Sequence, residues 1–248
     1  MGRYSKKMKK SLGIELKTEL KSQGADFVHF VNISQLSWEQ NKGYPNAILI
    51  GMTLSPGFIR EISGTMDYLK KTNRIKPIKM DEFHQTESQT DSMADDIAEY
   101  LIKIGYSAYS QSEDNIYSTG FYDEKAKTTP LPHKTIAGLA GLGWIGKHNL
   151  LVTSEFGSAV SMCTVLTDAP LKTVLHSPVE SQCGSCSICK DNCEVQAIEG
   201  NTWNIRTSRD ELLDVNKCDT CLRCLALCPW TQKYMPIKIK NKQTIHNL

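Results

Sequence analysis

Cysteine is missing from the first 162 residues of this 248-residue sequence, and its nine cysteines begin at Cys163. Long uninterrupted apolar runs are also missing, since none approaches the ~18 residues that span a bilayer. The N-terminus is basic but lacks the apolar segment and the small-residue cleavage site of a secretory signal. We therefore expect a cytoplasmic protein without membrane association, whose cysteines serve metal or redox chemistry rather than disulfides.

Strong charge of either sign is absent as well. The net charge of +2 does not by itself indicate nucleic acid or acidic lipid as a partner. Basic residues do gather in residues 3–10 and 233–242. Solvated chain ends are the favoured interpretation, and a phosphate-binding patch is the alternative.

The composition is that of a globular protein, with 40% hydrophobic and 23% charged residues, and no repeat is visible. Apolar spacing predicts helices over Met8–Ser22, Ser88–Ile104 and His133–Ala140. Runs rich in β-branched and aromatic residues predict strands over Asp26–Ile33, Ala47–Leu54, Tyr106–Ser110 and Ala159–Leu166. The polar stretch Ser112–Pro132 is expected to be a long loop. Interleaved helices and strands favour an α/β or α+β layered domain.

Eight of the nine cysteines fall into two runs of identical spacing, C-x2-C-x2-C-x3-C. The runs are Cys183-Gly-Ser-Cys186-Ser-Ile-Cys189-Lys-Asp-Asn-Cys193 and Cys218-Asp-Thr-Cys221-Leu-Arg-Cys224-Leu-Ala-Leu-Cys228. Bacterial two-cluster ferredoxins use this spacing, in which the fourth cysteine of each run ligates the other cluster. The spacing predicts one [4Fe–4S] cluster on Cys183, Cys186, Cys189 and Cys228, and a second on Cys193, Cys218, Cys221 and Cys224.

Zinc is the alternative metal for these cysteines. Structural zinc sites take four ligands, often as two separated C-x2-C pairs, and do not need the third step and fourth cysteine of each run. Iron–sulfur clusters are therefore favoured. Between the runs, Ser208-Arg-Asp-Glu211 predicts a capping box that opens a short helix through Asp214. The isolated Cys163 is expected to be a small buried side chain of a strand.

The glycine segment Gly141-Leu-Gly143-Trp-Ile-Gly146-Lys147 partly matches two nucleotide-binding motifs. As G-x-G-x-x-G it lacks the strand that should lead into it, since residues 135–140 are helix-like. As a phosphate-binding loop it has His148 where Ser or Thr would hold magnesium. A turn in which bare backbone approaches a bulky group, with Trp144 as an apolar face, remains. A plain turn that ends a helix is the alternative.

The residues Pro132–Lys147, continued by Asn149–Gly157 and Leu166–Leu171, resemble epoxyqueuosine reductase, as does a double-cluster segment that ends in Cys228-Pro-Trp230. That family is related to the reductive dehalogenases. The resemblance covers roughly residues 130–232. It implies an oxidoreductase that binds cobalamin, in which electrons pass through two [4Fe–4S] clusters to the cobalt of the corrinoid.

The resemblance also implies the fold. We expect the α+β class: a nitroreductase-like, corrinoid-binding α/β domain over residues 1–172, followed by a bacterial two-cluster ferredoxin-like domain over residues 173–248. The corrinoid-binding role extends to the residues that match the family motif, which are Gly141, Leu142, Gly143, Trp144, Gly146, Lys147 and Asn149.

The sequence departs from the family pattern in two places. The family's proton-donating aspartate position holds Lys127, and His133 is the nearest ionisable replacement, able to protonate near neutral pH. A solvated histidine in the first turn of a helix is the alternative. The chain also ends about twenty residues after its last cysteine, without the helical-repeat domain that helps the relatives to grip tRNA, so tRNA is doubtful as the substrate.

A low-potential donor such as ferredoxin or flavodoxin is the expected partner, and a small molecule or a corrinoid protein is the other candidate. Two other functions remain open: a reductive activator of another protein's corrinoid, and a plain ferredoxin-like electron carrier.

Overall fold

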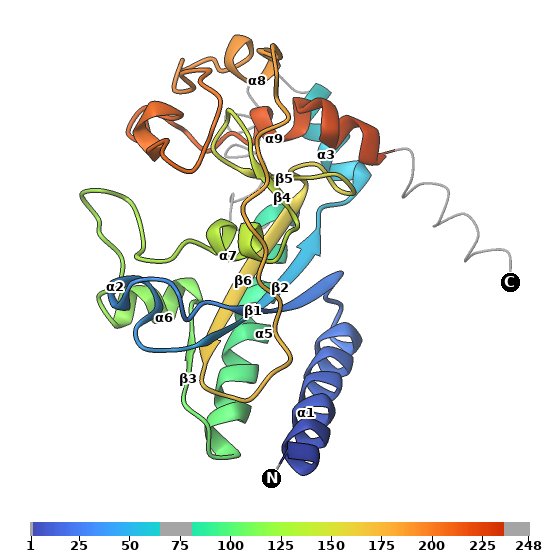
Figure 1. The fold of residues 1–248 in the computed structure, drawn as a ribbon. Helices are drawn as coiled ribbons and strands as arrows, with labels where there is room; N and C mark the ends of the chain where they lie inside the picture. The colour runs from blue at the N-terminus through green and yellow to red at the C-terminus, as the bar shows by residue number, and fades with distance from the viewer. Residues whose placement is uncertain (1, 65–80, 236–248) are drawn as a thin grey trace, which may run out of the picture. The chain divides into compact units, whose positions relative to one another are not determined.

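A computed structural model of the chain describes residues 2–64 and 81–235, with side chains from residue 11 onward (Figure 1). It divides into two compact units that each draw on three separate segments. The first consists of Met1–Met52, Thr86–Gly141 and Ser161–Ser177, and the second of Thr53–Gln85, Leu142–Val160 and Pro178–Leu248. Both cysteine runs lie in the second unit, and Cys163 lies in the first. The domain boundary at residue 172 stays a prediction.

The first unit is built on a four-stranded sheet with the order β1-β2-β6-β3. Its strands are β1 (Phe27–Asn32), β2 (Asn46–Thr53), β3 (Ala108–Ser110) and β6 (Val160–Thr167). β1 pairs antiparallel with β2, placing Phe27 opposite Gly51, and β3 pairs antiparallel with β6. Ile48, Leu49 and Ile50 of β2 are fully buried, as expected of a strand covered on both faces.

Two long helices supply seven of the fifteen buried residues in the apolar core of this unit: α1 (Gly2–Ser22) and α5 (Glu82–Lys103). Leu16 and Leu20 of α1 pack with Ile97 and Leu101 of α5 against Ile50 of the sheet. The remaining helices are α2 (Trp38–Asn41), α6 (Glu113–Ser118) and α7 (His133–Leu139), of which α7 packs against β1. Periodic leucine and isoleucine spacing therefore explains this layer.

The second unit carries two short strands, β4 (Gly143–Ile145) and β5 (Leu151–Thr153), which pair antiparallel. Its helical segments are α3 (Pro56–Gly64), α8 (Ile188–Asp191), η2 (Arg209–Glu211) and α9 (Arg223–Leu227), and residues 229–235 are also helical. Phe58 and Ile62 of α3 pack with Leu225 of α9 and with Tyr234, whose hydroxyl donates to the Leu54 carbonyl at 3.0 Å. α3 thus gives the cysteine runs an apolar support.

The predicted mixture of helices and strands is confirmed, and each predicted helix and strand has a counterpart in the structure. The assignments as nitroreductase-like and ferredoxin-like stay predictions. One expectation was wrong: Ser112–Pro132 begins with helix α6, whose six residues are too few to show apolar periodicity. The capping box of Ser208 and Glu211 is present, but the 3-10 turn that it opens ends at Glu211.

In the part of the chain that the structure describes, no helix combines the length and apolar character needed to cross a membrane. The side chains of the basic residues in residues 3–10 and 233–242 lie outside the described residues, except for Lys233.

Candidate functional site

Four cysteine thiols surround one cavity of about 100 Å³ in the second unit. They belong to Cys183, Cys186, Cys189 and Cys228, the four residues predicted to hold one cluster. Cys189 lies in α8 and Cys228 directly follows α9, and the packing of α8 on α9 brings them together. The remaining lining comes from Lys147, His148, Gln182, Pro229 and Trp230.

The second cysteine set lies around the start of α9. In addition to burial, the nearby Cys218 thiol raises the pKa of Cys221, and both of these thiols raise the pKa of Cys224. Cys189 of the first set also raises the pKa of Cys224. The two sets are therefore neighbours. Cys193 accepts a hydrogen bond from the backbone N–H of Ala197 at 3.3 Å, and no described contact joins its thiol to the other three.

The raised pKa values of these buried thiols are those expected of metal ligands in the absence of a cationic group. Burial, reinforced by neighbouring thiols, raises the pKa of Cys189 to about 11, and burial is also the main cause that raises the pKa of Cys221 to about 11. Iron would relieve this penalty, because it replaces the thiol protons with positive charge. Positive φ values at Gly184, Thr220 and Leu222 wind both cysteine loops tightly. The donors of the first set therefore fit an iron–sulfur cluster, and three of the four predicted donors of the second set lie together.

A single bound metal ion, unlike a cluster, requires at least three ligand side chains around one point. Among residues 11–64 and 81–235, no three His, Cys, Asp or Glu side chains converge on one ion position.

The glycine segment forms a β-hairpin strand beside the first cysteine set. β4 is followed by a turn and by β5, and not by a helix, so neither nucleotide-binding interpretation applies. Gly143 is required by packing, since a Cβ there would lie 1.9 Å from the Val152 carbonyl oxygen. Lys147, just beyond β4, donates from Nζ to the carbonyl oxygens of Gly184 (2.8 Å) and Cys186 (3.0 Å).

Besides the Ser181 hydroxyl, three buried nitrogen donors near the cysteines have no acceptor among the described side chains and backbone. They are the indole Nε1 of Trp144 and the guanidinium Nε and Nη1 of Arg223, between Cys221 and Cys224. A buried donor without an acceptor costs about 1–3 kcal/mol. Both residues therefore point to an acceptor that belongs to the bound groups. The sequence offered a signal for Arg223, a cation within the C-x2-C step, but its burial could not be predicted.

The residues predicted for the corrinoid are not equally accessible. Gly143, Trp144, Gly146 and Lys147 are buried, whereas Gly141 is exposed and Leu142 and Asn149 are half-buried. Gly141 belongs to the first compact unit, and the other six belong to the second. The corrinoid-binding role of these seven residues stays a prediction.

His133 is held in a defined tautomer by a chain of hydrogen bonds in the first unit. Gln111 Nε2 donates to the Leu131 carbonyl, and its Oε1 accepts from the Thr164 hydroxyl at 2.6 Å. Because the Thr164 proton is committed, its oxygen accepts the Nδ1–H of His133 at 2.9 Å. The Nε2 atom of His133 therefore carries the lone pair.

Burial lowers the pKa of His133 to about 4, so the ring is neutral at pH 7. This differs from the expectation of protonation near neutral pH, because the half-buried ring lacks a carboxylate partner that would stabilise its charge. A neutral ring whose N–H is bonded to Thr164 has no proton to give. Lys127 is exposed, in a turn closed by backbone pairing of Asp123 with Thr128.

Cys163 is fully buried in β6, as predicted. Burial and the neighbouring Asp91 raise its thiol pKa well above the ordinary value. Its pKa and its place in the core give it a structural role rather than a nucleophilic one.

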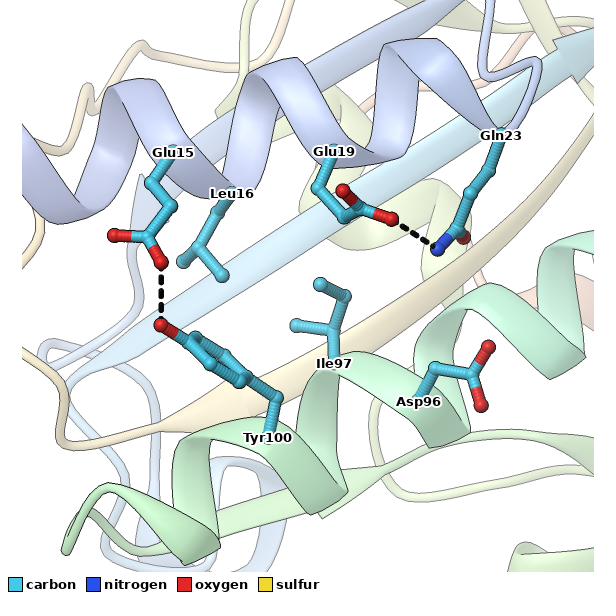
Figure 2. A pocket seen from close by; sticks show the side chains of 7 residues that line it. All are labelled: Glu15, Leu16, Glu19, Gln23, Asp96, Ile97 and Tyr100. Carbon is cyan, nitrogen blue, oxygen red and sulfur yellow. Dashed lines mark hydrogen bonds between the residues drawn. The ribbon is translucent and has the colours of Figure 1, made fainter.

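A larger cavity of about 360 Å³ lies in the first unit between α1 and α5 (Figure 2). Tyr100 donates to Glu15, and Gln23 donates to Glu19 at 2.9 Å, so lining groups bond to one another. Leu16 of α1 and Ile97 of α5 line the cavity and point toward one another (Figure 2). This groove reflects helix packing and holds no cysteine or histidine.

Comparisons with known proteins point in the same direction as the cysteine geometry. No protein-family model matches the chain. An epoxyqueuosine reductase of Aliivibrio fischeri is 30% identical over 200 residues, covering 73% of this chain and 52% of that protein. One from Synechococcus is 35% identical over 127 residues, covering 44% and 38%. The predicted resemblance is confirmed, although this chain spans about half the length of the Aliivibrio relative.

Solved structures of the same kind share the fold. A crystal structure of epoxyqueuosine reductase with an epoxyqueuosine-modified tRNA-Tyr stem loop has a TM-score of 0.53 at 18% identity, covering 90% of this chain and 66% of that chain. A catabolic reductive dehalogenase has a TM-score of 0.57 at 18% identity, covering 86% and 31%.

Proposed function

We propose that this chain is an iron–sulfur reductase of the epoxyqueuosine reductase type, which carries single electrons through two [4Fe–4S] clusters to the cobalt of a bound cobalamin. The observation that carries the proposal is the convergence of four thiols from both cysteine runs on one cavity. A run ligated entirely by its own cysteines would not bring Cys228 to Cys183 and Cys186. The sequence similarity to epoxyqueuosine reductases supports the same function.

The chain's own residues prepare the cluster site in three ways. The cysteine loops supply thiolates, Lys147 fixes the loop that contains Gly184, and Trp144 and Trp230 pack edge to face at 4.9 Å to exclude water. When bound, the clusters would exchange single electrons and a corrinoid would supply low-potential reduction at its cobalt. Gly141, Leu142 and Asn149 are the residues that we assign to contact with the corrinoid.

The substrate that we propose to test first is an epoxyqueuosine-modified tRNA stem loop, since one structural relative contains that ligand. A low-potential ferredoxin or flavodoxin in the cytoplasm would supply the electrons. The nitroreductase-like and ferredoxin-like domain assignments belong to the same proposal.

Anaerobic reconstitution tests this function. The protein is loaded with iron, sulfide and hydroxocobalamin, desalted and titrated with dithionite. We expect cobalamin to co-elute with the brown protein and to be reduced on it, whereas a Cys183→Ser, Cys218→Ser double variant should not reduce it. Clusters without bound cobalamin would contradict the proposal. In that case, reduction of a corrinoid on a separate protein would identify an activator, and its absence a plain electron carrier.

A further inference from the structure

We propose that Trp144 and Lys147 set the reduction potential of the cluster held by Cys183, Cys186, Cys189 and Cys228. Trp144 would donate its indole N–H to a sulfur of that cluster, and Lys147 would place a fixed positive charge beside it. The inference rests on the proposed function in one respect, namely that these four thiols hold a [4Fe–4S] cluster.

The surroundings of Trp144 leave sulfur as its acceptor. The side chain is 3% exposed and packs with Val152, Val179, Cys183, Cys228 and Trp230. Its Nε1 has no acceptor among the described protein atoms. Two of the five hydrophobic residues that it packs with are cysteines of the first set, and a thiolate or sulfide there can accept a hydrogen bond.

Lys147 presents a buried charge that needs an anionic partner. It is 8% exposed and lines the cavity with the four thiols. Two of its three ammonium protons go to the carbonyls of Gly184 and Cys186. No carboxylate in residues 11–64 and 81–235 forms an ion pair with it. A cluster bound by four thiolates is an anion, and it would supply the missing countercharge.

Charge and hydrogen bonding act on the potential in the same direction. One electron enters the cluster on reduction and adds a negative charge to it, without the making or breaking of a bond. A neighbouring ammonium and an N–H donor to sulfur both stabilise the more negative state. Removal of either should therefore lower the midpoint potential of this cluster and leave the other cluster unchanged.

The test is an EPR-monitored redox titration of the full chain loaded with both clusters. Trp144→Phe removes the N–H and keeps an aromatic ring, Lys147→Met removes the charge at similar volume, and Lys147→Arg keeps it. We expect a lower potential for one cluster in Trp144→Phe and Lys147→Met, and recovery toward the original value in Lys147→Arg. Trp38→Phe, at a site 67% exposed in the first unit, is the matched control and should shift neither.

Iron and sulfide analysis of each variant accompanies the titration. Loss of one cluster from Lys147→Met, with Lys147→Arg intact, would contradict the potential-setting role of Lys147 and show that it positions the cysteine loop instead. Two clusters with unshifted potentials in both Trp144→Phe and Lys147→Met would overturn the inference and leave the proposed function standing. Absence of clusters from the unaltered chain would remove both.

Discussion

Gly157 holds the helical segment after Cys228 in place, and its replacement by alanine should loosen the first cluster. Its φ is +59°, a left-handed conformation. A Cβ at this position would lie 2.2 Å from the backbone nitrogen of Thr231 and 2.6 Å from the carbonyl carbon of Trp230. The next residue, Ser158, donates its backbone N–H to the Thr231 hydroxyl at 2.9 Å. Alanine would therefore force two backbone segments apart, because the clashing atoms are backbone atoms and no side-chain rotamer change can relieve the clash.

The size of the effect follows from two contributions. A left-handed conformation costs an L-residue about 1–2 kcal/mol. Overpacking that forces a backbone shift costs about 1–3 kcal/mol more. The sum, about 2–5 kcal/mol, falls on a contact that positions Cys228. If only half of the lower value, about 1 kcal/mol, is taken off the free-energy barrier to unfolding, the cluster is lost about five-fold faster. About 1.4 kcal/mol corresponds to a factor of ten in rate.

The assay is the anaerobic bleaching rate of the cluster absorbance in a fixed concentration of urea, because cofactor loss makes unfolding irreversible. Gly157→Ala should bleach at least five-fold faster than the unaltered protein. The matched control is Gly138→Ala in α7, where a Cβ meets nothing within 4 Å and helix propensity favours alanine by about 0.5–1 kcal/mol. Equal bleaching rates for Gly157→Ala and the unaltered protein would refute the reasoning.

Three further predictions concern the cluster ligands, the buried histidine and the support from α3. Cys228→Ser should alter the EPR signal of the cluster that Cys183→Ser alters, and Cys193→Ser should alter the other; a shared target of Cys193→Ser and Cys183→Ser would contradict interleaved ligation. The NMR signals of the His133 ring should stay at their neutral positions from pH 8 to 5, because its folded pKa is about 4. Because the His133 pKa is lower in the folded than in the unfolded chain, the folded protein loses stability as pH falls from about 6.5 toward 4. An NMR titration midpoint near 6.5 would disprove the lowered pKa. Tyr234→Phe should speed bleaching, because the buried Leu54 carbonyl loses a donor worth about 1–3 kcal/mol; an unchanged rate would argue against that support.

Much of the first unit could be predicted from the sequence. The periodic apolar residues of α1 and α5 and the β-branched runs of β1 and β2 each bury one continuous set of side chains, so local pattern and tertiary structure agree. The cysteine spacing also groups the four cysteines of the first set, which line one cavity, and their role as cluster ligands stays a prediction.

The remainder depends on contacts between distant segments. Nothing local to α3 indicates that Phe58 and Ile62 pack beneath Leu225, more than 160 residues away. Strands β4 and β5 have three residues each, too few to show a period of two.

The glycine segment shows that a residue of a motif can also have a packing role that local spacing does not reveal. Its spacing resembles a site where bare backbone approaches a ligand, yet Gly143 is required by the Val152 carbonyl of the neighbouring strand. The resemblance assigns Lys147 to corrinoid binding, and the sequence does not predict its carbonyl partners in the first cysteine loop, which lie 37 and 39 positions further along the chain.

Iron and acid-labile sulfide analysis of anaerobically purified protein, combined with Mössbauer spectroscopy, tests the central claim most directly. Two [4Fe–4S] clusters predict about eight iron atoms and about eight sulfides per chain, with the quadrupole doublets of cubane iron. Zinc in place of iron, without acid-labile sulfide, would contradict the claim.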